Sequence, residues 1–155
     1  MSMEKTATIS DCGFYRYDLT RRWAEGGTTC AFIGLNPSTA DAEFDDPTIR
    51  RCIGFAKDWG HSMLVMLNAY AYRATNPKIL KRVDNPIGPL NDEYLLSWRS
   101  NCDEVIAAWG TNIAPLRQLA MVELFPSITV LKFTKDGYPG HPLYLPKTLT
   151  PMPWT

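Results

Sequence analysis

The chain has 155 residues, in which 16 Lys and Arg balance 16 Asp and Glu to a formal net charge of zero. Hydrophobic residues make up 45% and charged residues 21%, as in ordinary globular domains. These values exclude a protein that coats nucleic acid by bulk charge. They predict a single domain over residues 1–155.

Apolar runs are short throughout the sequence. The longest, such as Met63–Leu67 and Val105–Trp109, fall far below the roughly 20 residues that cross a bilayer. Residues Met1–Asp11 are polar and lack the apolar core of a secretory signal. We therefore expect a cytoplasmic protein with no membrane partner.

Cysteine spacing indicates no metal centre. No C-x-x-C is present, and the histidines are His61 and His141. We therefore expect reduced thiols, no metal site and no cofactor. The four cysteines are Cys12, Cys30, Cys52 and Cys102.

The first half of the chain predicts two strands and a helix. Phe14–Leu19 mixes aromatic and polar residues as a short strand does, and Thr29–Leu35 is an apolar run typical of a buried strand. Asp46 is a candidate N-cap, followed by Pro47 in the first helical turn. Apolar residues then recur at helical spacing as far as Gly60, a good residue just past a helix end.

The second half continues the alternation of strands and helices. A long loop is expected between the second buried strand and the next helix, and an irregular proline-rich tail at the end. In chain order, the expected segments are a strand at Met63–Leu67, a loop at Ala71–Pro89, a helix at Asn91–Asn101, a strand at Glu104–Trp109, a helix holding Leu116, Leu119, Ala120 and Leu124, a strand at Ile128–Phe133 and a tail at Pro139–Thr155.

Four apolar strands alternating with three helices predict an α/β fold. We expect a three-layer α/β/α arrangement with a central four-stranded parallel sheet and an N-terminal antiparallel hairpin strand. Ligands bind such sheets beyond the carboxyl ends of the strands. Polar breaks follow each predicted strand and are expected on that rim: Asn36-Pro37-Ser38, Asn68, Gly110-Thr111-Asn112 and Gly140-His141-Pro142.

The order of these segments resembles the uracil-DNA glycosylase superfamily. IGLNPS (33–38) resembles its first motif, and LVMLNAY (64–70) its second strand, whose terminal Asn reads the base. VIAAWGTNI (105–113) is similar to its third strand with a Trp-Gly turn, and GHPLYL (140–145) to its His-Pro-Ser-x-Leu loop. Leu143 stands at the Ser position of that loop.

A closer resemblance is carried by NPSTADAEFDDPTIRRC (36–52) together with HPLYLP (141–146). On these segments the chain is identified as a member of an uncharacterised bacterial and phage family, domain-of-unknown-function family sixteen forty-three. That family is similar, at a distance, to the glycosylases. The resemblance implies a fold more directly than an activity.

If the protein hydrolyses an N-glycosidic bond, the polar residues that follow the predicted strands have the following expected roles. Asn36, with Pro37 and Ser38 beside it, is placed to orient a water through its amide oxygen, although an amide is a poor proton acceptor. His141 is placed to donate a hydrogen bond to the departing base. Asn68 offers a donor and an acceptor to a base edge. The alternative for Asn36 and Asn68 is that they cap strands and satisfy loop backbone, and for His141 that it is a surface loop residue.

Three apolar or aromatic residues complete the expected substrate contacts. Phe44 and Tyr70 are candidates for stacking on an extruded base. Leu145 is placed like the leucine wedge that fills the hole left by a flipped nucleotide. Each of them also fits an ordinary packing role.

Charged residues allow two interpretations. Asp45 or Asp46 either lines the pocket, supplying the carboxylate that Asn36 lacks, or belongs to a solvated loop and an N-cap. Arg50 and Arg51 either contact phosphate or pair with the neighbouring acids. Further on, the acid-free stretch with Arg73, Lys78, Lys81 and Arg82 is either a backbone-binding surface or an ordinary solvated face.

Two functions follow from the sequence. The first is a uracil-DNA-glycosylase-like enzyme that hydrolyses the N-glycosidic bond of a damaged or modified base in nucleic acid. The second is a non-catalytic module that binds a nucleoside or nucleic acid on the same scaffold. The nucleophile elbow, Walker loop and dinucleotide-binding motifs are absent from the sequence, so other common enzyme classes gain no support.

Overall fold

The computed structural model describes residues 2–155. The strands are β1 (Glu4–Ile9), β2 (Arg16–Arg22), β3 (Thr29–Gly34), β4 (Met63–Asn68), β5 (Glu104–Ala107), β6 (Thr129–Val130) and β7 (Met152–Pro153). The α-helices are α1 (Pro47–Asp58), α2 (Asn91–Arg99) and α3 (Pro115–Leu124). Two short 3₁₀ helices, η1 (Pro77–Lys81) and η2 (Pro142–Tyr144), lie in the long loops. No helix among these residues is long and apolar enough to span a membrane.

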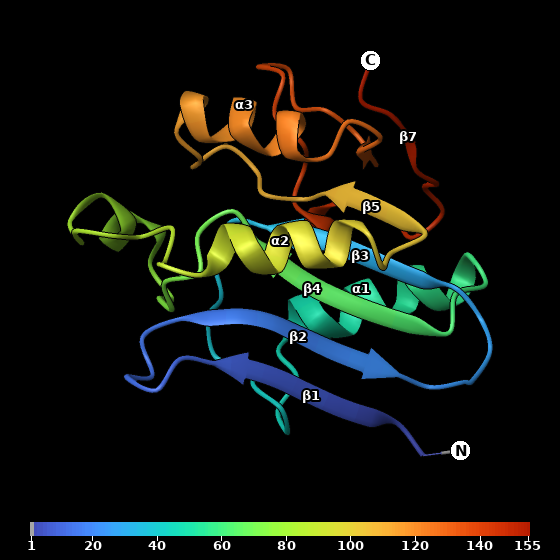
Figure 1. The fold of residues 1–155 in the computed structure, drawn as a ribbon. Helices are drawn as coiled ribbons and strands as arrows, with labels where there is room; N and C mark the ends of the chain where they lie inside the picture. Colours follow the sequence, from blue (N-terminus) through green and yellow to red (C-terminus); the bar gives the residue numbers. More distant parts are fainter. Residues whose placement is uncertain (1) are drawn as a thin grey trace.

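The strands form one mixed sheet of seven strands in the order β1-β2-β4-β3-β5-β6-β7 (Figure 1). The expectation of a four-stranded parallel sheet is therefore wrong for the sheet as a whole. The four predicted apolar runs do pair in parallel, β4 with β3, β3 with β5 and β5 with β6. Antiparallel strands extend this centre on both sides.

The N-terminal hairpin of β1 and β2 adds two antiparallel strands to one side of the parallel centre. β1 pairs with β2, and β2 then pairs with β4, so that the predicted hairpin strand lies inside the sheet and β1 forms the edge. At the other side, Thr129–Val130 alone of the predicted run Ile128–Phe133 is a strand. It pairs with Met152–Pro153, a short strand in the tail that was expected to be irregular.

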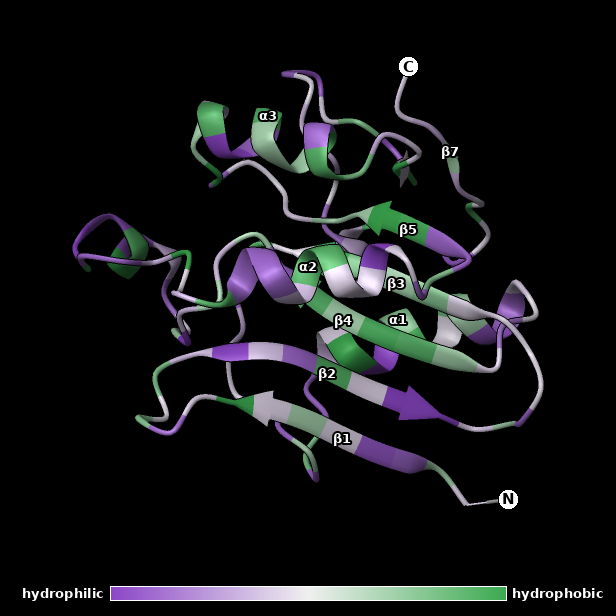
Figure 2. Ribbon diagram, in the orientation of Figure 1, coloured by the Kyte–Doolittle hydropathy of each residue, from purple (hydrophilic) through white to green (hydrophobic). Residues whose placement is uncertain are grey.

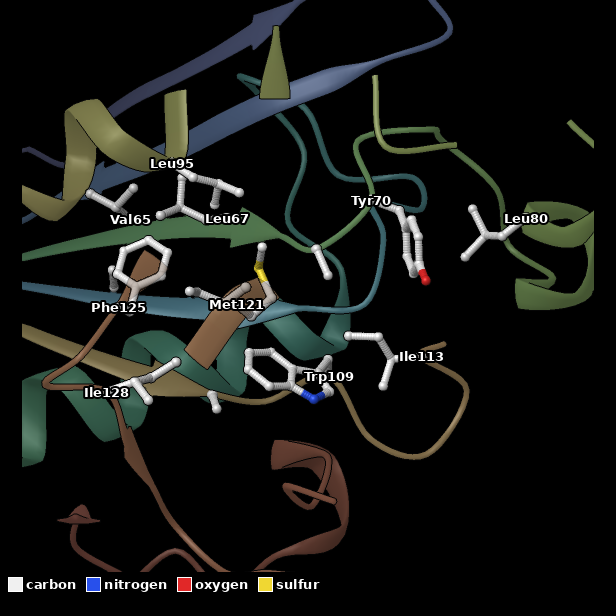
Figure 3. Packing of buried hydrophobic residues seen from close by; sticks show 14 of the residues in the cluster. Val65, Leu67, Tyr70, Leu80, Leu95, Trp109, Ile113, Met121, Phe125 and Ile128 are labelled. Atoms are coloured by element: carbon white, nitrogen blue, oxygen red, sulfur yellow. The ribbon is translucent and has the colours of Figure 1, made fainter. Parts of the chain in front are cut away.

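Helices cover both faces of the sheet, because side chains of successive strand residues point to opposite sides. Cys30, Phe32 and Leu64 face α1, where Ile49 and Cys52 lie in the same cluster. On the other face, residues of β3, β4 and β5 pack with α2 and α3 (Figure 3). That cluster includes Ala31, Ile33, Val65, Leu67, Leu95, Ala107 and Met121. Residues Met63–Leu67 of β4 are all apolar, and Figure 2 shows most of the strand in the hydrophobic colour, as a strand covered on both faces should be.

α1 begins and ends as its sequence predicts. The Asp46 carboxylate accepts a hydrogen bond from the backbone N–H of Ile49 (2.9 Å), and Pro47 occupies the first turn. Gly60 adopts a φ of 85° just after the helix, a conformation that favours glycine. In α3, by contrast, the predicted Leu116 and Leu119 are exposed.

β2 is buried along nearly its whole length although four of its seven residues are charged. Trp98 of α2 donates to the Asp18 carboxylate on one face, at 2.8 Å. On the other face the segment 40–46 covers Arg16 and Arg21, whose guanidinium groups donate to the Ala40 and Asp41 carbonyls. Hydrogen bonds to these distant segments make the burial of charged groups tolerable.

Leu95 tests the core packing beneath α2. It is fully buried, whereas its neighbour Leu96 is 39% exposed. We expect Leu95→Ala to lower the free energy of unfolding by about 3 kcal/mol, since it leaves a cavity in the core. Leu96→Ala on the same helix should cost less than about 1 kcal/mol. Urea denaturation measures both, and equal losses would contradict the packing described.

Candidate functional site

The carboxyl ends of β3, β4 and β5 meet at one rim, as their parallel pairing requires. A cavity of about 490 Å³ opens there. Its lining includes the predicted positions Asn36, Pro37, Ser38, Asp46, Asn68, Gly110 and His141. The expectation that the polar breaks of the chain share one rim is therefore confirmed, and the volume is that of a typical small-ligand site.

Asn36 is held on the turn after β3 by its own side chain. Its amide nitrogen donates to the backbone carbonyls of Pro37 (3.1 Å), Tyr72 (3.3 Å) and Ala74 (2.8 Å). These contacts determine the orientation of the amide. The carbonyl oxygen Oδ1 accepts no hydrogen bond from residues 2–155, so Asn36 presents an acceptor to the cavity that it lines.

Asn68 ends β4 and is 2% exposed. Its side-chain nitrogen is buried and has no hydrogen-bond partner among residues 2–155. The backbone around it is braced, because Asn91 donates to the carbonyl of Asn68 (3.0 Å) and Arg117 to that of Ala69 (2.9 Å). An unpaired donor in a braced, cavity-lining residue is what recognition of a ligand acceptor needs.

Gly34 allows Asn68 to approach β3. A Cβ at position 34 would lie 3.0 Å from the Asn68 side-chain oxygen and 3.1 Å from the Met66 terminal carbon. A side chain there would displace Asn68 or shift Met66. The glycine before the Leu35-Asn36 turn thus serves close packing within the rim.

His141 lies at the start of η2, and its ring orientation is set by the backbone. The N–H of Leu143 donates to His141 Nδ1 (3.2 Å), which leaves the proton of a neutral ring on Nε2. Burial lowers the pKa of His141 below its usual 6.5, and the Asp46 carboxylate opposes this effect. At neutral pH the residue is therefore an uncharged hydrogen-bond donor on the cavity wall.

Arg51 holds the loop that carries His141. Its guanidinium donates to the carbonyls of Pro142 (3.2 Å) and Leu145 (2.9 Å), which ties η2 to α1. Arg50 donates to the Asp45 carbonyl (2.9 Å) and is exposed. Arg73 donates to the Gly13 carbonyl at 3.3 Å. All three arginines considered for phosphate binding thus make contacts within the protein, and Arg51 makes two of them.

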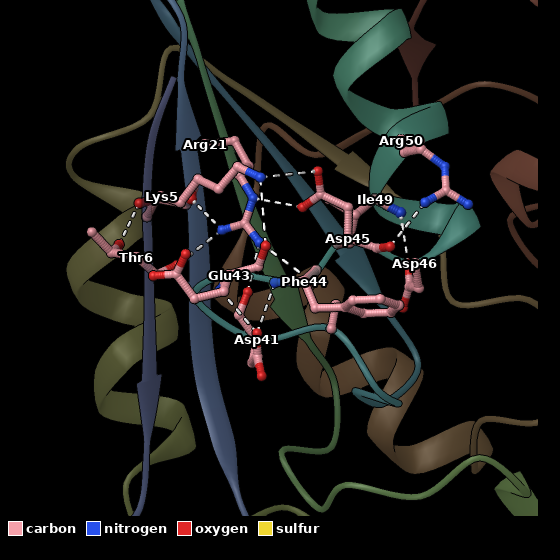
Figure 4. A network of polar contacts seen from close by, with 12 residues as sticks. Lys5, Thr6, Arg21, Asp41, Glu43, Phe44, Asp45, Asp46, Ile49 and Arg50 are labelled. Carbon is pink, nitrogen blue, oxygen red and sulfur yellow. Dashed lines mark hydrogen bonds and ion pairs between the residues drawn. The ribbon is translucent and has the colours of Figure 1, made fainter. Parts of the chain in front are cut away.

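The two aspartates before α1 have different surroundings. Asp46 caps the helix, as predicted, and it also lines the cavity. Asp45 pairs instead with the fully buried Arg21, whose Nε lies 2.7 Å from its carboxylate (Figure 4). Arg21 also donates to the carbonyls of Thr20 (2.8 Å) and Asp41 (2.6 Å). Asp45 therefore holds the segment 41–46 against β2 and is not among the cavity-lining residues.

The predicted stacking and wedge residues lie outside the cavity lining. Phe44 is 60% exposed, and Tyr70 is buried with its hydroxyl accepting from the N–H of Ala114 (3.2 Å). Leu145 packs against the cluster under α1 and close to Gly140. Tyr144 does line the cavity, is 84% exposed, and has its ring centroid 5.5 Å from that of His141.

Arg16 is the cavity residue that sequence reasoning missed. It is 2% exposed, its Nη1 donates to the Ala40 carbonyl (2.9 Å), and its buried Nε has no partner among residues 2–155. Burial lowers its pKa to about 10, so it remains charged at neutral pH. The FYRYDL pattern gave no signal, because a charged residue near the start of a strand is usually solvated.

Comparisons with known proteins give the family. Residues 16–143 match the family described as protein of unknown function (DUF1643). The match spans most of the chain, so the chain belongs to this family, as the motifs at 36–52 and 141–146 predicted. No curated protein and no solved structure matched the chain.

A substitution of Asp45 tests whether the Arg21–Asp45 pair holds the segment 41–46 against β2. Asp45→Asn keeps the shape but removes the charge that faces buried Arg21, and we expect a loss of about 3 kcal/mol in the free energy of unfolding. Glu43→Gln removes a charge from the exposed part of the same acidic run and should change stability by less than about 0.5 kcal/mol. If chemical denaturation gives equal values, the Arg21–Asp45 pair does not hold this segment.

His141 gives a pH test. Its pKa is lower in the folded protein than the usual 6.5, so the unfolded chain binds more protons and stability should fall as the pH drops below about 6.5. His141→Asn keeps an acceptor for the N–H of Leu143 but does not titrate, and should lose this component. Urea denaturation at pH 7.5, 6 and 5 measures the difference. Identical pH profiles would contradict a neutral, Nδ1-accepting ring.

Proposed function

We propose that this protein is a uracil-DNA-glycosylase-like hydrolase that cleaves the N-glycosidic bond of a damaged or modified base in nucleic acid. One observation carries the proposal: the acceptor of Asn36, the unpaired donor of Asn68 and the neutral donor of His141 all line one cavity. The order of the motifs that supply them supports a glycosylase-like fold.

Base recognition in this proposal uses donors that the protein leaves unpaired. Asn68 and Arg16 are buried donors without full partners, and a nucleobase oxygen or ring nitrogen supplies the missing acceptor. Among the described residues of the lining, the charges of Arg16 and Asp46 oppose one another. This balance suits an uncharged base better than a phosphate group.

Bond cleavage in this proposal uses Asn36 and Asp46 at the water and the sugar, and His141 at the departing base. Asn36 Oδ1 accepts a hydrogen bond from a water and orients it toward the sugar carbon, while Asp46 stabilises the positive charge that develops on the sugar. The bond between sugar and base breaks with its electron pair on the base, the water oxygen bonds to the sugar carbon, and the released proton neutralises the base anion. His141 donates its Nε2 proton in a hydrogen bond to the departing base as negative charge develops there. A neutral donor suits this role, since it need not lose a charge between substrate and product.

Nucleic acid in this proposal lies across the face that carries η2. Tyr144 beside the cavity is the exposed aromatic residue suited to stack on an extruded base or its neighbour. Arg50 and Lys147 line an adjacent groove of about 430 Å³ and are placed to contact the phosphate backbone. The proposal assigns further contacts with nucleic acid to Phe44, Arg73, Lys78, Lys81 and Arg82.

A second candidate is a non-catalytic module that binds a base or nucleoside in the same cavity. The amide of Asn36 favours it, because its nitrogen is bound to three backbone carbonyls and its oxygen is too weak a base to take a proton from water. In this case the contacts of Arg16 and Asn68 remain, and His141 contributes to binding alone.

The two candidates are separated by oligonucleotides carrying uracil, hypoxanthine or hypermodified bases, single-stranded and duplex, followed by alkaline cleavage of abasic sites. Strand cleavage on any of them supports the hydrolase. Binding without cleavage supports the module. Neither binding nor cleavage across the panel would contradict both.

His141→Ala should lower kcat on a cleaved substrate by about 100-fold with little change in binding, because the donor acts mainly on charge that develops in the transition state. Arg16→Met should instead weaken binding by about tenfold or more, since it removes a charged donor. Glu43→Gln, exposed and outside the cavity, is the matched control and should leave both unchanged. Unaltered turnover in His141→Ala would remove His141 from the mechanism.

A further inference from the structure

A second cluster of reactive side chains lies at the opposite end of the sheet from the cavity. Cys30 near the start of β3, His61 in the turn before β4 and Glu104 at the start of β5 bring their Sγ, ring nitrogen and carboxylate oxygen within 4.8 Å of one another. The register explains two of them, because Cys30 lies opposite Glu104 in the β3–β5 pair. Side chains of paired residues point to the same face of a sheet.

The turn after α1 brings the third residue to the cluster. The His61 N–H donates to the Ala56 carbonyl (3.0 Å), which continues the end of α1, and the Trp23 indole donates to the His61 carbonyl (2.9 Å). Hydrogen bonds on both sides of the peptide thus hold His61 in place. The turn links α1 to β4, so the cluster joins three separate elements of the fold.

The ring of His61 is oriented as in many metal sites. Its Nδ1 lies 2.7 Å from the Thr28 hydroxyl, and its Nε2 lies 3.2 Å from the Glu104 carboxylate. A histidine that binds a metal through one ring nitrogen commonly has its other nitrogen hydrogen-bonded to a neighbouring group. Thr28 supplies that contact, and Nε2 faces the Glu104 carboxylate.

Cys30 lies on the buried side of the cluster and Glu104 on its open side. Cys30 is fully buried, whereas the Glu104 side chain is 29% exposed and that of His61 is 10% exposed. A divalent cation bound between these groups takes Cys30 as its thiolate, and the thiol proton is released to solvent.

We propose that Cys30, His61 and Glu104 bind one Zn²⁺ ion. Thiolate, imidazole and carboxylate together are a ligand set for zinc, whereas Mg²⁺ and Ca²⁺ take oxygen ligands. Tetrahedral zinc places its ligand atoms about 3.3–3.6 Å apart, so the present spacing requires only a small closure. Glu104 is the most exposed of the three side chains. The site is separate from the cavity and does not depend on the proposed hydrolysis.

Spacing along the chain does not reveal this cluster, since more than thirty positions separate each ligand from the next. The expectation of no metal site came from the lack of a C-x-x-C motif, which signals ligands close in sequence. Three ligands from three elements leave no such signature.

Metal-free full-length protein, titrated with Zn²⁺ in a calorimeter, tests the site. We expect one equivalent to bind, and Mg²⁺ not to bind. Cys30→Ser and Glu104→Gln should each weaken Zn²⁺ binding by at least about tenfold, and Thr28→Val, which removes the contact to His61, by about tenfold. Co²⁺ in place of Zn²⁺ should give a thiolate charge-transfer band that Cys30→Ser abolishes.

Two controls keep the result decisive. Cys52→Ser alters another fully buried thiol outside the cluster, and Cys12→Ser removes the exposed thiol; both should bind Zn²⁺ like the unmodified protein. Glu104 is partly exposed, so Glu104→Gln provides a folded variant even where Cys30→Ser is unstable. Absence of a one-equivalent binding event, or Glu104→Gln binding as tightly as the unmodified protein, would overturn the proposal.

Discussion

The pairing register of β3 with its two parallel neighbours is the constraint on which the rest of the structure depends. Gly34 lies opposite Asn68 in β4, and Ile33 opposite Ala107 in β5, so the three strands end together. Every polar residue that follows them must then emerge at one rim. The same register brings Cys30 and Glu104 together at the other end. A slip of one residue would reverse the faces of the central strand and separate both groups.

Rigidity at the rim comes from backbone hydrogen bonds rather than from apolar packing. The Asn36 amide, the His141 ring and the Asn68 backbone are each held by main-chain groups or by side chains from another element. The Asn36 and His141 side chains, oriented in this way, are preorganised for a ligand. Gly34 contributes by its lack of a side chain, since Asn68 takes up the space that a Cβ would need.

Strand β2 differs from the other strands in its buried arginines. Arg16 and Arg21 both point from β2 toward the segment 40–46, but their surroundings differ. Arg21 is paired with Asp45 and surrounded by carbonyl oxygens, as a structural arginine should be. Arg16 keeps an unpaired buried nitrogen and lines the cavity. Unpaired buried donors are costly, so a free one beside a cavity points to a ligand contact.

The sequence by itself determined the features that depend on neighbours along the chain. The buried strands β3 and β4, the cap of α1 at Asp46 and Pro47, its end at Gly60 and the polar breaks on the rim all follow from local patterns. Tertiary structure decided the place of β2 beside β4, the partners of Arg16 and Arg21 and the meeting of Cys30, His61 and Glu104. β2 has the composition of a solvated segment, and only distant segments that supply hydrogen bonds make it a buried strand. Such contacts join residues far apart in the chain, so a local sequence pattern does not predict them.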